Sequence, residues 1–192
     1  KIIEILTQQK VKMKVAAITG DDVLSIVQQQ GSSITDLENG ELLSSYDIIS
    51  ANAYLGADPI VRALEAGAQI ILTGRVADPS LFLAPMIHEF GWKMDDYDIL
   101  GKGTVIGHLL ECAGQVTGGY FADGVKKKVE GLENLGHPFA DVFADGTAVI
   151  SKVEDTGGMV NLQTVKEQLL YEVMNPHEYF TPDVIADFTT VQ

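Results

Sequence analysis

The sequence has a single cysteine, Cys112, few basic residues and no long apolar run. One cysteine cannot form an internal disulfide, which is typical of proteins from reducing compartments. No apolar stretch approaches the roughly 18 residues that a membrane-spanning helix needs. Residues 1–7 lack the form of a signal peptide. We therefore expect a cytoplasmic protein that does not associate with membranes.

Basic residues are scarce relative to acidic ones. The 192 residues include 13 Lys and Arg against 27 Asp and Glu, which gives a formal net charge of −14. Nucleic acids and anionic membranes repel such a surface, so we expect no nucleic-acid partner. The one basic cluster, residues 126–128, is interpreted as a solvated loop rather than an anion site. A hydrophobic fraction of 46% indicates a packed globular protein rather than a disordered chain.

Strand-like apolar runs alternate with helix-like segments along the first two thirds of the chain, a pattern that predicts an α/β fold. Strands are expected at 14–19, 46–51, 69–73 and 97–100. Helices are expected at 22–30, after Asp58-Pro59, from Asp78-Pro79 to Gly91, and at 104–116. We therefore expect residues 1–124 to form a mainly parallel sheet with flanking helices.

Residues 125–192 follow a different pattern. Glycine turns and an alternating apolar run at 147–153 predict a β-rich segment, and a last helix is expected at 162–173. Polar residues at 166–168 are interpreted as a solvated helix face. We expect a smaller mixed α+β portion that belongs to the same structural unit as residues 1–124.

Polar side chains follow the predicted parallel strands. In such sheets ligands bind beyond the carboxyl ends of the strands, where Asn52, Tyr54 and Arg75 are found. A guanidinium can hold a carboxylate or phosphate through two parallel hydrogen bonds, so Arg75 is a candidate anion-binding residue. Asn52 and Tyr54 are candidates for orienting a substrate. The alternative for Arg75 is a structural salt bridge to Asp58 or Asp78.

The predicted helix at 104–116 carries four polar side chains on one face, at positions i, i+3, i+4 and i+7. They are His108, Glu111, Cys112 and Gln115. Imidazole, carboxylate and thiol groups act as acids, bases or nucleophiles, so the first three are candidate catalytic residues. Gln115 is a candidate substrate-binding residue. The alternatives are a buried structural cysteine and a simple His–Glu pair. No spaced Cys and His residues complete a metal site, so none is expected.

Two glycine motifs remain. Gly118 and Gly119 have backbone amides that can cradle an anion, which makes them candidate substrate-binding residues, although a plain turn is the alternative. The glycines at 101, 103 and 107 loosely match a dinucleotide-binding fingerprint, which makes a nucleotide-binding module a weaker, third interpretation. The cofactor is unknown from the sequence.

Several long stretches of the chain together resemble one known family: 52–92, 107–123, 156–158 with 165–173, and 181–188. In this order, over residues 14–191, they resemble the AtuA-like family of acyclic terpene utilisation proteins. Relative to that family, we expect this chain to lack an N-terminal segment with a glycine-rich first strand and to stop before many members end. The resemblance implies a place in acyclic terpenoid degradation through acyl-CoA intermediates. It also implies an association with biotin-dependent acyl-CoA carboxylase subunits, and it supplies no established catalytic residues.

Residues and resemblance together favour an enzyme of acyl-CoA, branched-chain or terpenoid acid catabolism. A lyase or hydratase-type step on a small-molecule substrate, a CoA thioester, suits the candidate residues. The alternative is a non-catalytic accessory subunit of an acyl-CoA carboxylase, which predicts a large exposed apolar patch. A homo-oligomer is a further, open expectation.

Overall fold

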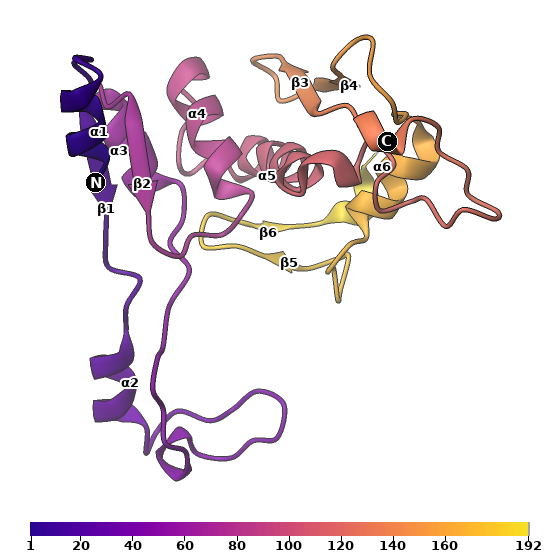
Figure 1. The fold of residues 1–192 in the computed structure, drawn as a ribbon. Coiled ribbons are helices and arrows are strands. Elements are labelled where there is room, and N and C mark those ends of the chain that lie inside the picture. Colours follow the sequence, from indigo (N-terminus) through magenta and orange to yellow (C-terminus); the bar gives the residue numbers. More distant parts are fainter. Residues whose placement is uncertain (192) are drawn as a thin grey trace. The chain divides into compact units, whose positions relative to one another are not determined.

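The computed structural model describes residues 1–191, and Figure 1 shows its elements. The helices are α1 (Ile2–Gln8), α2 (Leu24–Gln30), α3 (Asp58–Glu65), α4 (Ser80–Phe90), α5 (Tyr97–Glu111) and α6 (Leu162–Leu169). The strands are β1 (Val15–Ile18), β2 (Ile70–Thr73), β3 (Pro138–Val142), β4 (Ala148–Lys152), β5 (Tyr179–Phe180) and β6 (Ile185–Ala186). None of the helices within residues 1–191 is long and apolar enough to span a bilayer.

The strands of the described chain form three sheets of two strands each. β1 and β2 pair in parallel, with Val15 opposite Ile70, whereas β3–β4 and β5–β6 are antiparallel hairpins. The mixed α/β character is therefore confirmed, but a mainly parallel sheet is not. The predicted strand at 46–51 does not form, and the residue after it, Asn52, makes only an isolated antiparallel bridge to Asp22.

The second predicted strand that does not form, residues 97–100, is the first turn of α5. Asp96 caps this helix, because its carboxylate accepts a hydrogen bond from the backbone N–H of Ile99. The helix then runs to Glu111, so it begins and ends earlier than the predicted range 104–116. A short apolar run fits a buried helix turn as well as a strand, and here the capping residue decides.

The chain divides into two compact units, and the division passes through α3. The first unit consists of residues 1–55 and 62–76, and the second of residues 56–61 and those from Ala77 onward. Most of the buried apolar side chains belong to the second unit, including Leu83 and Leu100, which are both fully buried. The first unit contains a long segment, residues 24–50, in which only Gly31 is buried.

Helices α4 and α5 pack closely because α5 has glycines on the facing side. A Cβ atom at Gly103 would lie 2.5 Å from the Leu83 side chain, and one at Gly107 would lie 2.6 Å from the carbonyl oxygen of Pro79. These glycines are inside a helix that no strand precedes, so the dinucleotide-fingerprint interpretation is wrong. Their role is to let two helices approach each other.

Candidate functional site

His108 and Glu111 form a buried pair one turn apart on α5. The His108 side chain is 1% exposed, and its Nδ1 lies 2.9 Å from Oε1 of Glu111. The distance is that of an ion pair, but the angles are not those of a hydrogen bond. Both ring nitrogens of His108 and Oε2 of Glu111 lack a hydrogen-bond partner among the described residues. Each such buried polar atom costs about 1–3 kcal/mol, so the surrounding packing holds this pair at a cost in stability.

Two aromatic rings close over His108. The ring centroids of Tyr179, on β5, and Phe188, in a short 3-10 helix, lie 5.2 and 5.3 Å from that of the imidazole. These two rings stack on each other with centroids 4.7 Å apart. Sequence reasoning missed both residues because they lie about 70 positions beyond α5. The one signal was their place beside or within the family-like stretch 181–188.

The hydroxyl of Tyr179 is held in its neutral form. Burial raises its pKa well above the ordinary range, and the nearby charges of Glu111 and Asp78 raise it further. The phenol therefore keeps its proton at every physiological pH. A neutral phenol beside a histidine and a carboxylate can donate a hydrogen bond to a negative charge that develops on a substrate.

Cys112 lies directly after α5 as its C-cap residue and is partly exposed. Burial raises the pKa of its thiol, and the charge of Glu111 raises it further, against a smaller opposing effect of Gln168. A neutral thiol is a poor nucleophile. The electrostatics of the cluster thus disfavour covalent catalysis by Cys112.

Gln168 of α6 joins the predicted residues into one cluster. Its Nε2 donates a hydrogen bond of 3.2 Å to the carbonyl oxygen of His108, and its Oε1 accepts one of 3.2 Å from Gln115 Nε2. Gln115 lies in a 3-10 turn, 113–115, rather than on α5. Gln168 is fully buried, so the interpretation of 166–168 as a solvated face is wrong for this residue.

The other predicted residues come together in the first unit. Asn52 Nδ2 and the backbone N–H of Arg75 donate hydrogen bonds of 3.0 and 2.9 Å to the carboxylate of Asp21. The bond from the Arg75 backbone is the main cause that lowers the pKa of Asp21. The Arg75 guanidinium lies 4.6 Å from the centroid of the Tyr54 ring and donates a hydrogen bond to the Tyr54 hydroxyl. Three of these four residues are candidate site residues predicted from the sequence, whereas Asp21 is expected at the end of the strand 14–19 without an assigned role.

Gly118 and Gly119 form a tight turn. Their amides donate hydrogen bonds to the carbonyl oxygens of Gln115 (3.1 Å) and Gly114 (2.9 Å), respectively. Gly118 has φ +107°, a conformation that favours glycine. Both amides are engaged within the turn, and a substrate-binding role for the pair stays a prediction.

Asp183 is a further residue that the sequence did not single out. Its carboxylate accepts hydrogen bonds from the backbone N–H of Ala57 (2.8 Å) and from the hydroxyl of Ser80 (2.5 Å). It thereby ties the segment 181–188, which contains Phe188, to the start of α4. As for metals, no group of three or more His, Cys, Asp or Glu side chains within residues 1–191 is arranged to hold an ion.

These features define a mixed α/β protein with a buried His–Glu pair under an aromatic cover. The family model described as acyclic terpene utilisation family protein AtuA matches residues 1–192, and the chain belongs to that family. The resemblance predicted from the sequence is thereby confirmed. Comparisons with curated proteins and with solved structures found no significant match.

Proposed function

We propose that the protein is an enzyme of acyclic terpenoid catabolism that transfers a proton on a branched-chain acyl-CoA thioester, in a lyase or hydratase-type step. The observation that carries this proposal is the His108–Glu111 pair, with 2.9 Å between Nδ1 and Oε1 and with buried polar atoms that have no protein partner within residues 1–191. Such unpaired atoms are costly in a structural pair and useful in a pair that meets a substrate. Membership of the acyclic terpene utilisation family supports the substrate class.

The chemistry is simplest in the elimination direction. The Glu111 carboxylate removes the C2 proton of a 3-hydroxyacyl thioester, and the electron pair of that bond forms the C2–C3 double bond. The C3 hydroxyl leaves as water with a proton that His108 donates. Hydration is the reverse. The neutral Tyr179 hydroxyl stabilises negative charge on the thioester oxygen.

Gln168 positions this pair, and Cys112 leaves its charge undisturbed. Gln168 holds the backbone of the His108 turn through its hydrogen bond to the carbonyl oxygen. The thiol of Cys112, whose pKa is raised, stays neutral and adds no charge beside Glu111. In the first unit we propose that Arg75 binds an anionic group of a ligand, with Asn52 and Tyr54 holding its surroundings in place.

A second candidate function is that of an accessory subunit that binds an acyl-CoA carboxylase. The observation in its favour is the segment 24–50, in which several apolar side chains are exposed to solvent. Leu37 is 100% exposed and Ile49 is 86% exposed. Exposed apolar side chains on a segment without buried neighbours are typical of an interaction surface.

A turnover assay separates the two functions. The full chain is incubated with a panel of branched 3-hydroxyacyl-CoA and 2-enoyl-CoA thioesters, and interconversion is followed by mass spectrometry. We expect turnover of at least one thioester, and a loss of about 10² to 10⁴-fold in kcat for His108→Gln and for Glu111→Gln.

The matched controls are His88→Gln and Glu89→Gln. These substitutions remove an imidazole and a carboxylate, as the test variants do, but from exposed positions on α4. They are expected to keep full activity. If no thioester is turned over, or if all four variants match the wild type, the proton-transfer proposal is wrong. Co-purification with carboxylase subunits would then support the accessory function.

A further inference from the structure

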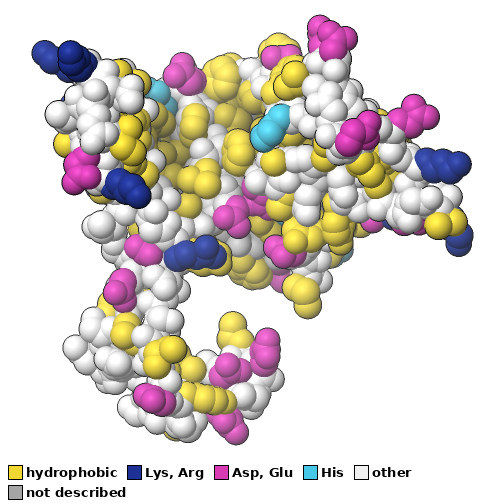
Figure 2. Space-filling model, viewed as in Figure 1, with side chains coloured by type: hydrophobic (Ala, Val, Ile, Leu, Met, Phe, Trp, Pro, Cys, Tyr) yellow, Lys and Arg dark blue, Asp and Glu magenta, His cyan; other side chains and the backbone are white. Residues whose placement is uncertain are grey.

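A pocket between the loop 123–127 and helix α6 concentrates positive charge. It has a volume of about 370 Å³, and three of the residues that line it are Lys126, Lys127 and Lys166. Only 13 Lys and Arg occur in the whole chain, against 27 Asp and Glu. Lys and Arg side chains are accordingly sparse on the face seen in Figure 2. Three lysines around one pocket therefore stand out from the rest of the surface.

The loop that carries two of these lysines is held in a fixed shape. The carboxylate of Asp123 accepts hydrogen bonds of 2.8–2.9 Å from the backbone N–H groups of Val125, Lys126 and Lys127. These bonds lower the pKa of Asp123, so its carboxylate stays charged and keeps them at neutral pH. The lysine side chains are thus presented from a preorganised loop.

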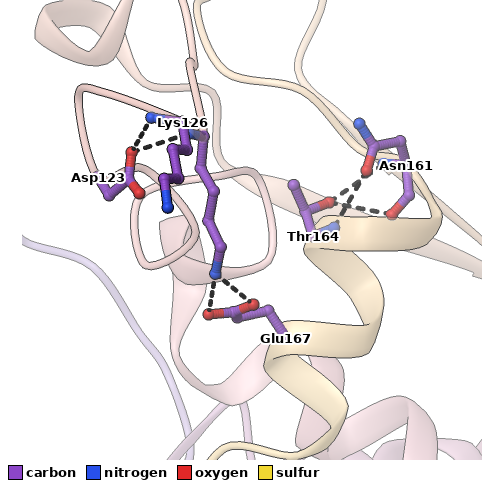
Figure 3. Close-up of polar contacts among 6 residues, drawn as sticks. Asp123, Lys126, Asn161, Thr164 and Glu167 are labelled. Carbon is purple, nitrogen blue, oxygen red and sulfur yellow. Dashed lines mark hydrogen bonds and ion pairs between the residues drawn. The ribbon is translucent and has the colours of Figure 1, made fainter.

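The opposite wall is equally well defined. Asn161 caps α6 by accepting hydrogen bonds from the backbone N–H groups of Gln163 and Thr164, and the Thr164 hydroxyl accepts one from the Asn161 backbone. Figure 3 shows this cap and Glu167 on α6, with Asp123 and Lys126 on the loop. A complete capping box fixes the first turn of the helix, which carries Gln163, and Lys166 lines the pocket from the next turn.

The charges of the pocket are unequally paired. Lys127 Nζ binds both carboxylate oxygens of Glu167 at 2.8 and 2.9 Å and lies 4.8 Å from the centroid of the Phe121 ring. The exposed side chains of Lys126 and Lys166 have no hydrogen bond or ion pair among the described residues. Two cations thus remain available beside a neutralised third, and Gln163 also lines the pocket.

We propose that this pocket binds a small, soluble ligand that carries a phosphate or diphosphate group. Lys126 and Lys166 bind the phosphate oxygens, Gln163 donates a further hydrogen bond, and Phe121 and Leu170 contact the rest of the ligand. The strongly acidic surface elsewhere excludes an anionic membrane as the source of the phosphate. The interpretation of residues 126–128 as a merely solvated loop is replaced by this proposal, which does not depend on the His108–Glu111 pair.

Calorimetric titration of the full chain with inorganic pyrophosphate, and separately with AMP, tests the proposal. Saturable binding at one site is expected. The double variant Lys126→Gln with Lys166→Gln is expected to weaken it by about tenfold for each lysine lost. The double variant Lys12→Gln with Lys93→Gln changes the net charge equally at exposed positions that do not line the pocket and should leave the affinity unchanged.

Glu167→Gln provides the opposite test, because it removes the negative charge from the pocket and releases Lys127. We expect this variant to bind pyrophosphate more tightly, with a melting temperature and circular dichroism spectrum that show an intact fold. Three results would overturn the proposal: no binding to the wild type, equal weakening in both double variants, or no gain in affinity for Glu167→Gln.

Discussion

Asp183 accepts a hydrogen bond of 2.5 Å from the hydroxyl of Ser80, across 103 positions of sequence. Its other carboxylate oxygen accepts one of 2.8 Å from the backbone N–H of Ala57. One side chain near the C-terminus therefore holds the N-terminal end of α4 in place. It also fixes the segment whose Phe188 ring covers His108.

Asp183→Ala is expected to lower the free energy of unfolding by about 2–4 kcal/mol, since it leaves two donors without their charged acceptor. Chemical denaturation followed by circular dichroism measures this change. Asp95→Ala is the control, because it removes an exposed carboxylate in the same unit and is expected to change stability by less than about 0.5 kcal/mol. Equal stability of the two variants would show that the Asp183 network contributes nothing.

The Asp21 cluster predicts a specific dependence of stability on pH. The pKa of Asp21 is lowered from its usual value of 3.8, mainly by the backbone N–H of Arg75. A pKa that is lower in the folded state adds stability above the unfolded pKa, and this stability is lost as the pH falls through the folded pKa. Wild type should therefore be more stable than Asp21→Asn at pH 6, and this advantage should disappear as the pH falls below 3.8.

Thermal unfolding of both proteins between pH 7 and pH 3 checks this prediction. Asp22→Asn is the control, since the neighbouring carboxylate accepts no hydrogen bond from Arg75 or Asn52. A constant difference between wild type and Asp21→Asn across the range would contradict the lowered pKa.

Much of the fold follows from local sequence signals. The apolar runs at 14–19 and 69–73 form β1 and β2, and the alternating run at 147–153 forms β4. Each run is short, rich in residues that favour strands and bounded by turn residues, which is the pattern typical of a strand. Gly91 ends α4 in the left-handed conformation expected of a C-terminal glycine.

Other parts depended on tertiary contacts that one sequence does not reveal. Residues 46–51 look like a strand, but β1 pairs directly with β2 instead. Tyr179, Phe188 and Gln168 join the candidate site from segments far along the chain. The helical spacing predicted Glu111 beside His108 on the same helix, whereas the aromatic cover and the buried glutamine required the folded structure.

The reactivity of Cys112 tests the electrostatics of the candidate site. Burial and the charge of Glu111 raise the pKa of this thiol, so at pH 7.5 it should react with iodoacetamide several-fold more slowly than an exposed cysteine. Glu111→Gln removes the negative charge and is expected to increase the rate. Alkylation followed by mass spectrometry gives both rates, and Glu89→Gln on α4 serves as the control. A slower reaction in Glu111→Gln than in wild type would contradict this interpretation.

Two glycines of α5 should respond in opposite directions to the same substitution. Gly101 has nothing within 4 Å of a Cβ atom, so Gly101→Ala is expected to stabilise the protein by about 0.5–1 kcal/mol through its higher helix propensity. Gly107 faces the Pro79 backbone, so Gly107→Ala is expected to destabilise by about 1–3 kcal/mol. Denaturant unfolding of the two variants measures both changes in the free energy of unfolding. Equal effects would mean that α4 and α5 do not approach each other as closely as described.

Incorporation of solvent deuterium tests proton transfer by His108 and Glu111 most directly, because it detects removal of the C2 proton even when no product accumulates. The full chain is incubated in D₂O with the panel of branched acyl-CoA thioesters, and deuterium at C2 is measured by mass spectrometry. Wild type and His88→Gln should incorporate deuterium into at least one thioester, whereas Glu111→Gln should do so at least about 100 times more slowly. Equal incorporation by wild type and Glu111→Gln, or none with any thioester, would contradict the assignment of this pair as the proton-transfer site.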